Sequence, residues 1–153
     1  MESIAQRLAQ ELSQPVGYVE NVISLIDEGN TIPFIARYRK ELHGSMDDTT
    51  LRTLEDRLQY LRNLQKRATM AREKGLEPLA DLLFAKGPGL DPVEAAEPFV
   101  DPEKGVEDVA AALQGASDII AERIADNAAV RKSLRNLFLR QGVLVSRAAD
   151  KEP

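Results

Sequence analysis

The run of basic and aromatic side chains at residues 37–40 is the part of this sequence best suited to binding chemistry. Arg37, Tyr38, Arg39 and Lys40 follow one another in a segment with helix-start signals. Residues three apart share one helix face, and a tyrosine ring can stack on a base or on a partner. In the structural alternative, Arg37 pairs with an acid of a neighbouring helix and Tyr38 covers the edge of the core. The run indicates a contact site, and both interpretations stay open at this point.

A second group of cations lies towards the C-terminus. Residues 128–147 contain five basic side chains and no acidic one, whereas residues 75–127 contain 3 basic and 12 acidic side chains. The net charge of −5 argues against nucleic acid as a partner of the whole chain. The local basic tracts could still bind it. The commoner arrangement is that basic and acidic helices of one domain pair with each other. The contact residues expected in this second group are Arg131, Lys132, Arg135 and Arg140.

Groups that could perform catalysis or hold a metal are sparse. His43 is the only histidine, and beside Gly44 in a turn it is expected to be solvated or to cap a helix. Asp47 and Asp48 precede a helix, where capping and the helix dipole explain adjacent acids. One imidazole and two adjacent carboxylates cannot complete a tetrahedral or octahedral metal shell. The glycines at residues 87–89 lack the Lys-Ser/Thr of a phosphate-binding loop. We therefore expect no enzyme, no metal and no cofactor.

The composition is that of a folded helical protein. A chain of 153 residues can form one medium domain or two small ones. Only 5% of the residues are aromatic and none is Trp, so the core must consist of Leu, Ile, Val and Ala, which favours helices. The lack of cysteine suits a reducing cytoplasm, and no signal peptide or membrane span is evident. We expect a soluble cytoplasmic protein.

Apolar residues recur at helical spacing along the whole chain, which predicts an all-α fold. Short helices are expected from Ile4 to Leu12, from Pro15 to Gly29, and from Thr31 as N-cap to about Glu41. Three short helices with tight turns would make a helix-turn-helix-like unit at residues 1–45, an arrangement that can read DNA but is also a common way to pack helices.

A long central helix is expected at residues 46–74. Its leucines follow a 3-4-3 pattern that marks a core-facing stripe, so Leu54 and Leu58 are expected to be buried, together with Phe34 of the preceding unit. A helical subdomain would occupy residues 75–147, so that residues 1–147 form one helical domain. It is expected to begin with a short helix that contains Leu76 and ends at residues 87–89, followed by a helix start at Asp91. A long helix follows, in which Gly115 allows close approach of a neighbour. The last expected features are a final helix capped by Asp126 or Asn127 and ended by Gly142, a short strand at Val143–Ser146 and a frayed tail at residues 148–153.

Residues 30–41 read Asn-Thr-Ile-Pro-Phe-Ile-Ala-Arg-Tyr-Arg-Lys-Glu, and a distinctive pattern continues to residue 61. This stretch resembles the signature of the Tex family of bacterial transcription-accessory proteins, and a weaker similarity extends over residues 4–147. Members of that family usually have more helix and a basic, proline-containing loop before the motif at residues 75–78. The resemblance therefore indicates that an internal stretch is missing near residues 67–71.

The resemblance implies the N-terminal scaffold and contact domain of a transcription-accessory protein that binds nucleic acid, including RNA, as a full-length molecule. The nuclease-like, helix-hairpin-helix and S1 domains of full-length members have no counterpart in this sequence, so nucleic acid would be bound mainly through domains absent from this chain. RNA polymerase, other transcription proteins and the remaining domains are the other partners implied. The alternative is a helical protein-interaction module with no nucleic-acid contact of its own.

Overall fold

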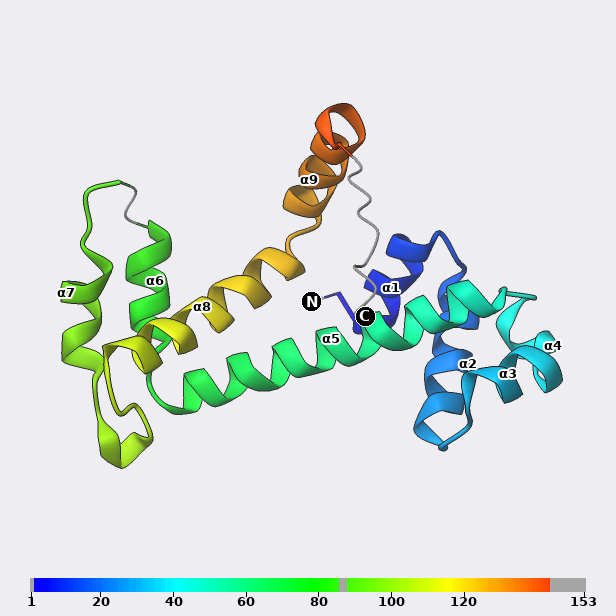
Figure 1. Cartoon of the computed structure of the whole chain (residues 1–153), viewed down its shortest axis with the longest axis horizontal. Coiled ribbons are helices and arrows are strands. Elements are labelled where there is room, and N and C mark those ends of the chain that lie inside the picture. The colour runs from blue at the N-terminus through cyan, green and yellow to red at the C-terminus, as the bar shows by residue number, and fades with distance from the viewer. Residues whose placement is uncertain (1, 86–87, 144–153) are drawn as a thin grey trace, which may run out of the picture.

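In the computed structural model, which describes residues 2–85 and 88–143, every regular element is a helix (Figure 1). The predicted all-α fold is confirmed. In chain order the elements are α1 (Ile4–Leu12), α2 (Val16–Asp27), α3 (Ile32–Tyr38), α4 (Lys40–His43), α5 (Asp48–Glu73), α6 (Glu77–Ala85), α7 (Pro92–Ala96), the 3-10 turns η1 (Glu97–Phe99) and η2 (Pro102–Lys104), α8 (Val109–Asp126) and α9 (Ala128–Gln141). None of the described helices is both long and apolar enough to cross a membrane.

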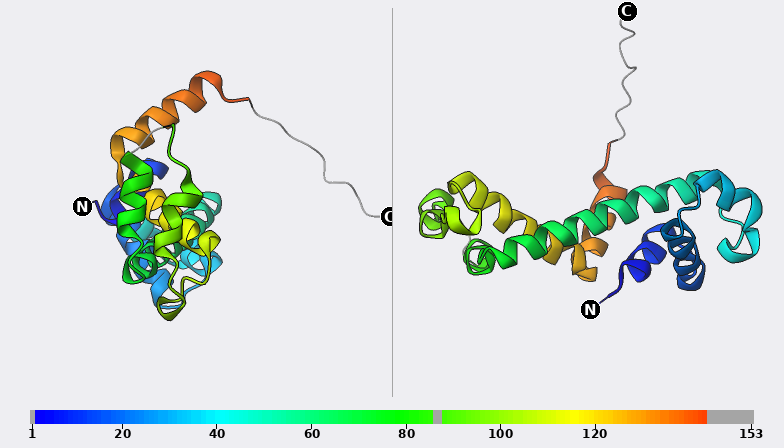
Figure 2. Two further views of the ribbon diagram at one scale, coloured as in Figure 1. Left: turned by 90° about the vertical axis from the view of Figure 1, so that its left-hand side faces the viewer. Right: turned by 90° about the horizontal axis from the view of Figure 1, so that it is seen from below.

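The long helix α5 is the axis of the molecule. Helices α1, α2 and α3 pack on its first half, with α4 against α2 and α3. Helix α8 packs along its second half, with α6 and α7 against α8, and α9 projects away from the body (Figures 1 and 2). The buried side chains accordingly form two clusters. The first contains Leu51, Leu54, Leu58 and Leu61 of α5 with residues of α1, α2 and α3, as the leucine pattern predicted. The second is built from α5, α6, α7 and α8 around Ala68.

Helix α5 is long because nothing in its sequence interrupts it. The Asp47 carboxylate accepts a hydrogen bond from the Thr50 backbone N–H at 2.7 Å, which satisfies one of the unpaired donors at the helix start. No Gly or Pro occurs until Gly75, whose φ of +78° ends the helix. The helix therefore runs unbroken through residues 67–71, where the resemblance to the family indicates a missing stretch.

The N-terminal unit follows the predicted helix boundaries with one exception. A capping box between Ser3 and Gln6 opens α1, and α2 begins directly after Pro15. The helix predicted to run from Thr31 to Glu41 is instead divided at Arg39, whose φ of −126° leaves the helical region. In an uninterrupted helix the side chain at residue 43 would point about 80° away from that of Ile35. Because the chain changes direction at Arg39, both of these side chains are buried.

The second half of the chain confirms the prediction for Gly115. A β-carbon built at this position would lie 2.3 Å from the Leu76 Cδ1 atom and 3.4 Å from the Ala71 β-carbon. A larger residue would therefore displace the buried Leu76 side chain, which packs against α8 here. Asn127 caps α9 by accepting from the backbone N–H groups of the next turn, as predicted. Most of the strand predicted at Val143–Ser146, and all of the predicted tail at residues 148–153, lie outside the described residues.

Candidate nucleic-acid interface

The cations of residues 37–40 are exposed and unpaired in the described part of the chain. Arg37 and Arg39 lie on either side of Tyr38, and Lys40 begins α4. None of the three cations appears in an ion pair with a described carboxylate. The Tyr38 ring is 58% exposed and does not cover the core. Arg37 therefore does not pair with an acid of a neighbouring described helix, and Tyr38 does not cover the edge of the core. The surface is open to a partner.

Phe34 belongs to this surface, and the prediction that it is buried is wrong. Helix α3 turns Ile32 and Ile35 into the core, which leaves Phe34 on the outer side, 36% exposed. One turn further on, Tyr38 contacts it, with ring centroids 5.2 Å apart and ring planes at 45°. The Arg39 guanidinium lies 5.6 Å from the centre of the Phe34 ring, at cation–π distance. We call these two rings, together with Arg37, Arg39 and Lys40, which neighbour them in the chain, the aromatic-basic patch.

The second predicted group of cations is divided by the structure. Arg131 is largely buried and pairs with the Glu2 carboxylate at 2.6 Å, which ties α9 to the N-terminus. The hydrogen bond from Arg131 also lowers the pKa of Glu2 below its usual range. Lys132, Arg135 and Arg140 are exposed and have no ion pair with a described carboxylate. Arg131 therefore supports the fold, while the other three remain available.

Basic and acidic helices do pair in the middle of the molecule, as the commoner interpretation predicted. Arg72 of α5 binds Glu122 of α8 at 2.6 Å, and Arg123 of α8 binds Asp81 of α6 at 2.6 Å. Arg67 of α5 lies 3.6 Å from Asp118 of α8, and this pair also joins α5 to α8. These ion pairs join α5, α6 and α8 to one another. Among the described residues, the cations of the aromatic-basic patch and Lys132, Arg135 and Arg140 of α9 remain outside such ion pairs.

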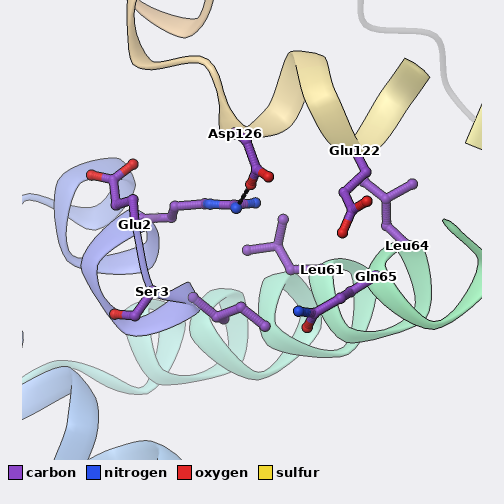
Figure 3. Close-up of a pocket in the computed structure, with 9 residues that line it drawn as sticks. Glu2, Ser3, Leu61, Leu64, Gln65, Glu122 and Asp126 are labelled. Atoms are coloured by element: carbon purple, nitrogen blue, oxygen red, sulfur yellow. Dashed lines mark ion pairs between the residues drawn. The ribbon is translucent and has the colours of Figure 1, made fainter. Parts of the chain in front are cut away.

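A polar pocket of about 240 Å³ lies where α1 meets α5 and α8. Glu122 and Asp126 reach into it from α8, above Leu61, Leu64 and Gln65 of α5 (Figure 3). Arg7 of α1 is buried there and forms an ion pair with Asp126, and burial lowers the pKa of Arg7. Because Asp126 lies 119 positions away in the chain, sequence reasoning missed this joint. We assign it a structural role, since Arg7 pairs with Asp126 across the pocket and Glu122 pairs with Arg72 of α5.

His43 does not lie where the sequence analysis expected it. Its side chain is buried rather than solvated, and neither ring nitrogen has a described hydrogen-bond partner. The change of direction at Arg39 turns it inward, which no local pattern indicates. Among the described residues, no three metal-ligating side chains come together.

Helix α9 carries a set of exposed apolar side chains. Leu134, Leu137, Phe138 and Leu139 are all exposed. Leu134 also lines a groove of about 460 Å³ between α5, α8 and α9, beside Tyr60 and Arg135. A run of exposed large apolar residues on a charged helix is typical of a surface that packs against another protein segment.

Two family models match this chain. The Tex-like protein N-terminal domain matches residues 2–74, and the Tex central region-like model matches residues 87–152. Protein tex of Bordetella pertussis is 36% identical over 96% of this chain and 24% of the relative. Transcriptional accessory protein Tex of Neisseria gonorrhoeae is 35% identical over 88% of this chain and 23% of the relative. S1 RNA-binding domain-containing protein 1 of Homo sapiens is 47% identical over 31% of this chain and 5% of the relative.

The chain spans about a quarter of the length of the bacterial relatives it matches. The alignment with the Bordetella protein covers 192 residues, which exceeds the 153 residues of this chain. That relative therefore carries additional residues inside the aligned region, in agreement with the missing internal stretch indicated by the resemblance.

Proposed function

The chain belongs to the Tex family, and from that premise we propose that it is the N-terminal scaffold and contact domain of a transcription accessory protein that binds nucleic acid. It contributes no catalysis in this proposal. Nucleic acid is also bound by further domains of the longer molecule, with RNA polymerase or other transcription proteins as additional partners. The setting of such a protein is the bacterial cytoplasm.

The observation that carries the proposal is the set of unpaired cations around exposed rings in the aromatic-basic patch. Elsewhere in the described chain, arginines such as Arg57, Arg62 and Arg72 are held by carboxylates. Arg37, Arg39 and Lys40 are not, so they can neutralise phosphates and release counterions. With few cations and an acidic stretch at residues 75–127, we expect weak, sequence-tolerant binding, with dissociation constants of about 10⁻⁴ M or weaker near physiological salt.

Charge reversal tests this role of the patch. We expect the double variant Arg39→Glu and Lys40→Glu to lower affinity for labelled oligonucleotides about tenfold or more at low salt, and equally on every sequence, because phosphate contacts carry no sequence information. Fluorescence anisotropy measures the affinity. The matched control is Lys66→Glu, which reverses an exposed cation on α5 that also lacks a described ion pair. If the double variant binds as tightly as the unaltered chain, the patch is not the contact site.

The exposed apolar side chains of α9 favour one alternative, a helical protein-interaction module with no nucleic-acid contact of its own. In that case Leu134, Leu137 and Phe138 would pack into a groove of a partner, as amphipathic helices do. The basic side chains of α9 would then favour a protein partner with an acidic surface, rather than phosphates. Oligonucleotide binding by the unaltered chain distinguishes the two functions, because the interaction module would bind no oligonucleotide at low salt. If the chain does bind, Phe138→Ser should leave the affinity unchanged, since the aromatic-basic patch is then the nucleic-acid site.

A further inference from the structure

We propose that α9 is a movable arm, and that the ion pair between Arg131 and Glu2 is the latch that holds the arm in its observed direction. Release of the latch lets α9 turn about Asn127 while both core clusters stay folded. The inference goes beyond the proposed function and does not depend on it, because it concerns how the chain moves and not what it binds.

Helix α9 has no anchor in either core cluster. None of its residues is buried, neither cluster contains a residue from it, and it packs mainly on α8. Figure 2 shows it leaving the body of the molecule. Burial of apolar surface, which holds the other long helices in place, therefore does not fix the direction of α9.

A single residue separates the arm from α8. Helix α8 ends at Asp126 and α9 begins at Ala128, and Asn127 between them has an extended backbone, with φ of −85° and ψ of 102°. A small rotation about these two dihedral angles changes the direction of the whole of α9. The Asn127 side chain accepts hydrogen bonds from the first turn of α9, so the helix start stays capped. The arm can therefore turn as one piece.

The polar contacts that fix the arm converge on the Arg131 guanidinium. It donates to the Glu2 carboxylate at 2.6 Å, to the Gln10 side-chain oxygen at 3.4 Å and to the Ala125 backbone carbonyl. Gln10 also donates to Glu2, which holds the carboxylate in place. Ala125 belongs to α8, so only Glu2 and Gln10 tie the arm to the N-terminal unit. Among the described residues, no other ion pair or side-chain hydrogen bond joins α9 to residues 2–73.

A second arginine beside the latch favours its release. Burial, and after it the positive charge of Arg131, lower the pKa of Arg7, so the two guanidinium groups repel each other. Glu2 beside Arg131 and Asp126 beside Arg7 offset this repulsion. The side chains of Arg131 and Glu2 are 16% and 21% exposed, so dissolved ions reach their pair. When the charge of Glu2 is removed or screened, the remaining repulsion drives the arm away.

The groove of about 460 Å³ between α5, α8 and α9 changes with the arm. Leu134 and Arg135 of α9 form one of its walls, and Tyr60 and Leu61 line it from α5. Because the two α9 residues lie about one turn after Arg131, release of the latch moves their wall relative to α5. The latch therefore controls the width of the groove, and an anion that competes for Arg131 changes that width.

Distance measurements between two nitroxide labels test the latch, and the chain has no native cysteine to interfere. Labels at Leu139→Cys on α9 and Lys66→Cys on α5 report the direction of the arm, because both side chains are exposed. Double electron–electron resonance should give one narrow distance distribution for the chain with an intact latch. Glu2→Ala and Arg131→Ala should each broaden it, since loss of a charged hydrogen bond shifts an equilibrium by roughly tenfold to a hundredfold. In 1 M sodium chloride, where the screening length is about 3 Å, the intact latch should show the same broadening.

Two controls accompany these measurements. Lys132→Ala removes the neighbouring cation of α9, which is exposed and has no described ion pair, and should leave the distribution narrow. A second pair of labels, at Phe84→Cys on α6 and Lys66→Cys on α5, reports the second core cluster. Its distance distribution should stay the same in every variant, which shows that the fold is intact.

Four outcomes would overturn the inference. An unchanged distribution in Glu2→Ala and Arg131→Ala means that packing on α8 fixes α9, and a broad distribution with the latch intact means that the latch does not hold. Broadening in Arg131→Ala alone means that the pair with Glu2 is not the latch. Broadening in both variants but not in 1 M sodium chloride means that the pair is a permanent tie. Equal broadening of the Phe84 pair means that the arm does not move separately from the second core cluster, and the inference is then wrong as well.

Discussion

Replacement of Leu58 by alanine is expected to lower the free energy of unfolding by about 2–5 kcal/mol, the usual cost of truncating a core leucine. Leu58 is 3% exposed and lies near the middle of the first core cluster, where α5 meets α1 and α2. The substitution leaves a cavity that helices packed from several directions cannot fill. Urea denaturation followed by far-UV circular dichroism measures the change.

Leu139→Ala is the matched control, because it makes the same substitution in a helix at a side chain that is 79% exposed. We expect it to change stability by no more than about 0.5 kcal/mol. A change of less than about 0.5 kcal/mol in Leu58→Ala itself would mean that the leucine stripe of α5 faces solvent or a partner, and the two-cluster core would be wrong.

The second large effect is expected at the joint between α1 and α8. Arg7 is buried in the pocket between these helices and pairs with Asp126. Arg7→Ala therefore leaves the Asp126 carboxylate without its ion-pair partner. Loss of a charged hydrogen bond of this kind costs about 1.5–3 kcal/mol. Thermal and urea unfolding of Arg7→Ala should show this loss of stability.

Arg52→Ala is the control for this joint. Arg52 pairs with Asp48 one turn away at 2.6 Å, and both side chains are more than half exposed. Such pairs within one helix contribute about 0.5 kcal/mol or less. Equal effects of Arg7→Ala and Arg52→Ala would show that the joint adds nothing beyond a surface ion pair, and that α1 is held by its packing on α2 and α5.

Local patterns in the sequence were sufficient for most of the helices. The leucine stripe of α5, the Asn127 cap and the close approach at Gly115 are each determined by neighbours a few residues away or by side-chain size. The break at Arg39 could not be predicted in this way. It allows Ile35 and His43 to be buried together, and that depends on how α3 and α4 pack on other helices.

The sequence predicted where the candidate site lies, but not all of the residues that form it. The basic run at residues 37–40 was visible in the sequence. Phe34, in contrast, looked like a core residue because it is aromatic and adjacent to Ile35, and only the orientation of α3 places it outside. Likewise, Arg131 and Lys132 are equivalent in the sequence. Arg131 is set apart by its pairing with Glu2, 129 positions away.

Binding of a labelled single-stranded RNA at two salt concentrations, 50 and 200 mM, tests the central claim most directly. Each neutralised phosphate of a single strand contributes a slope of about −0.7 to the logarithm of affinity against the logarithm of salt, so three cations predict a loss of roughly twentyfold between the two concentrations. In the Arg39→Glu and Lys40→Glu variant the slope should fall to about a third. The account is contradicted if the affinity is the same at both salt concentrations, as an apolar helix-in-groove contact would give, or if the double variant keeps the full slope.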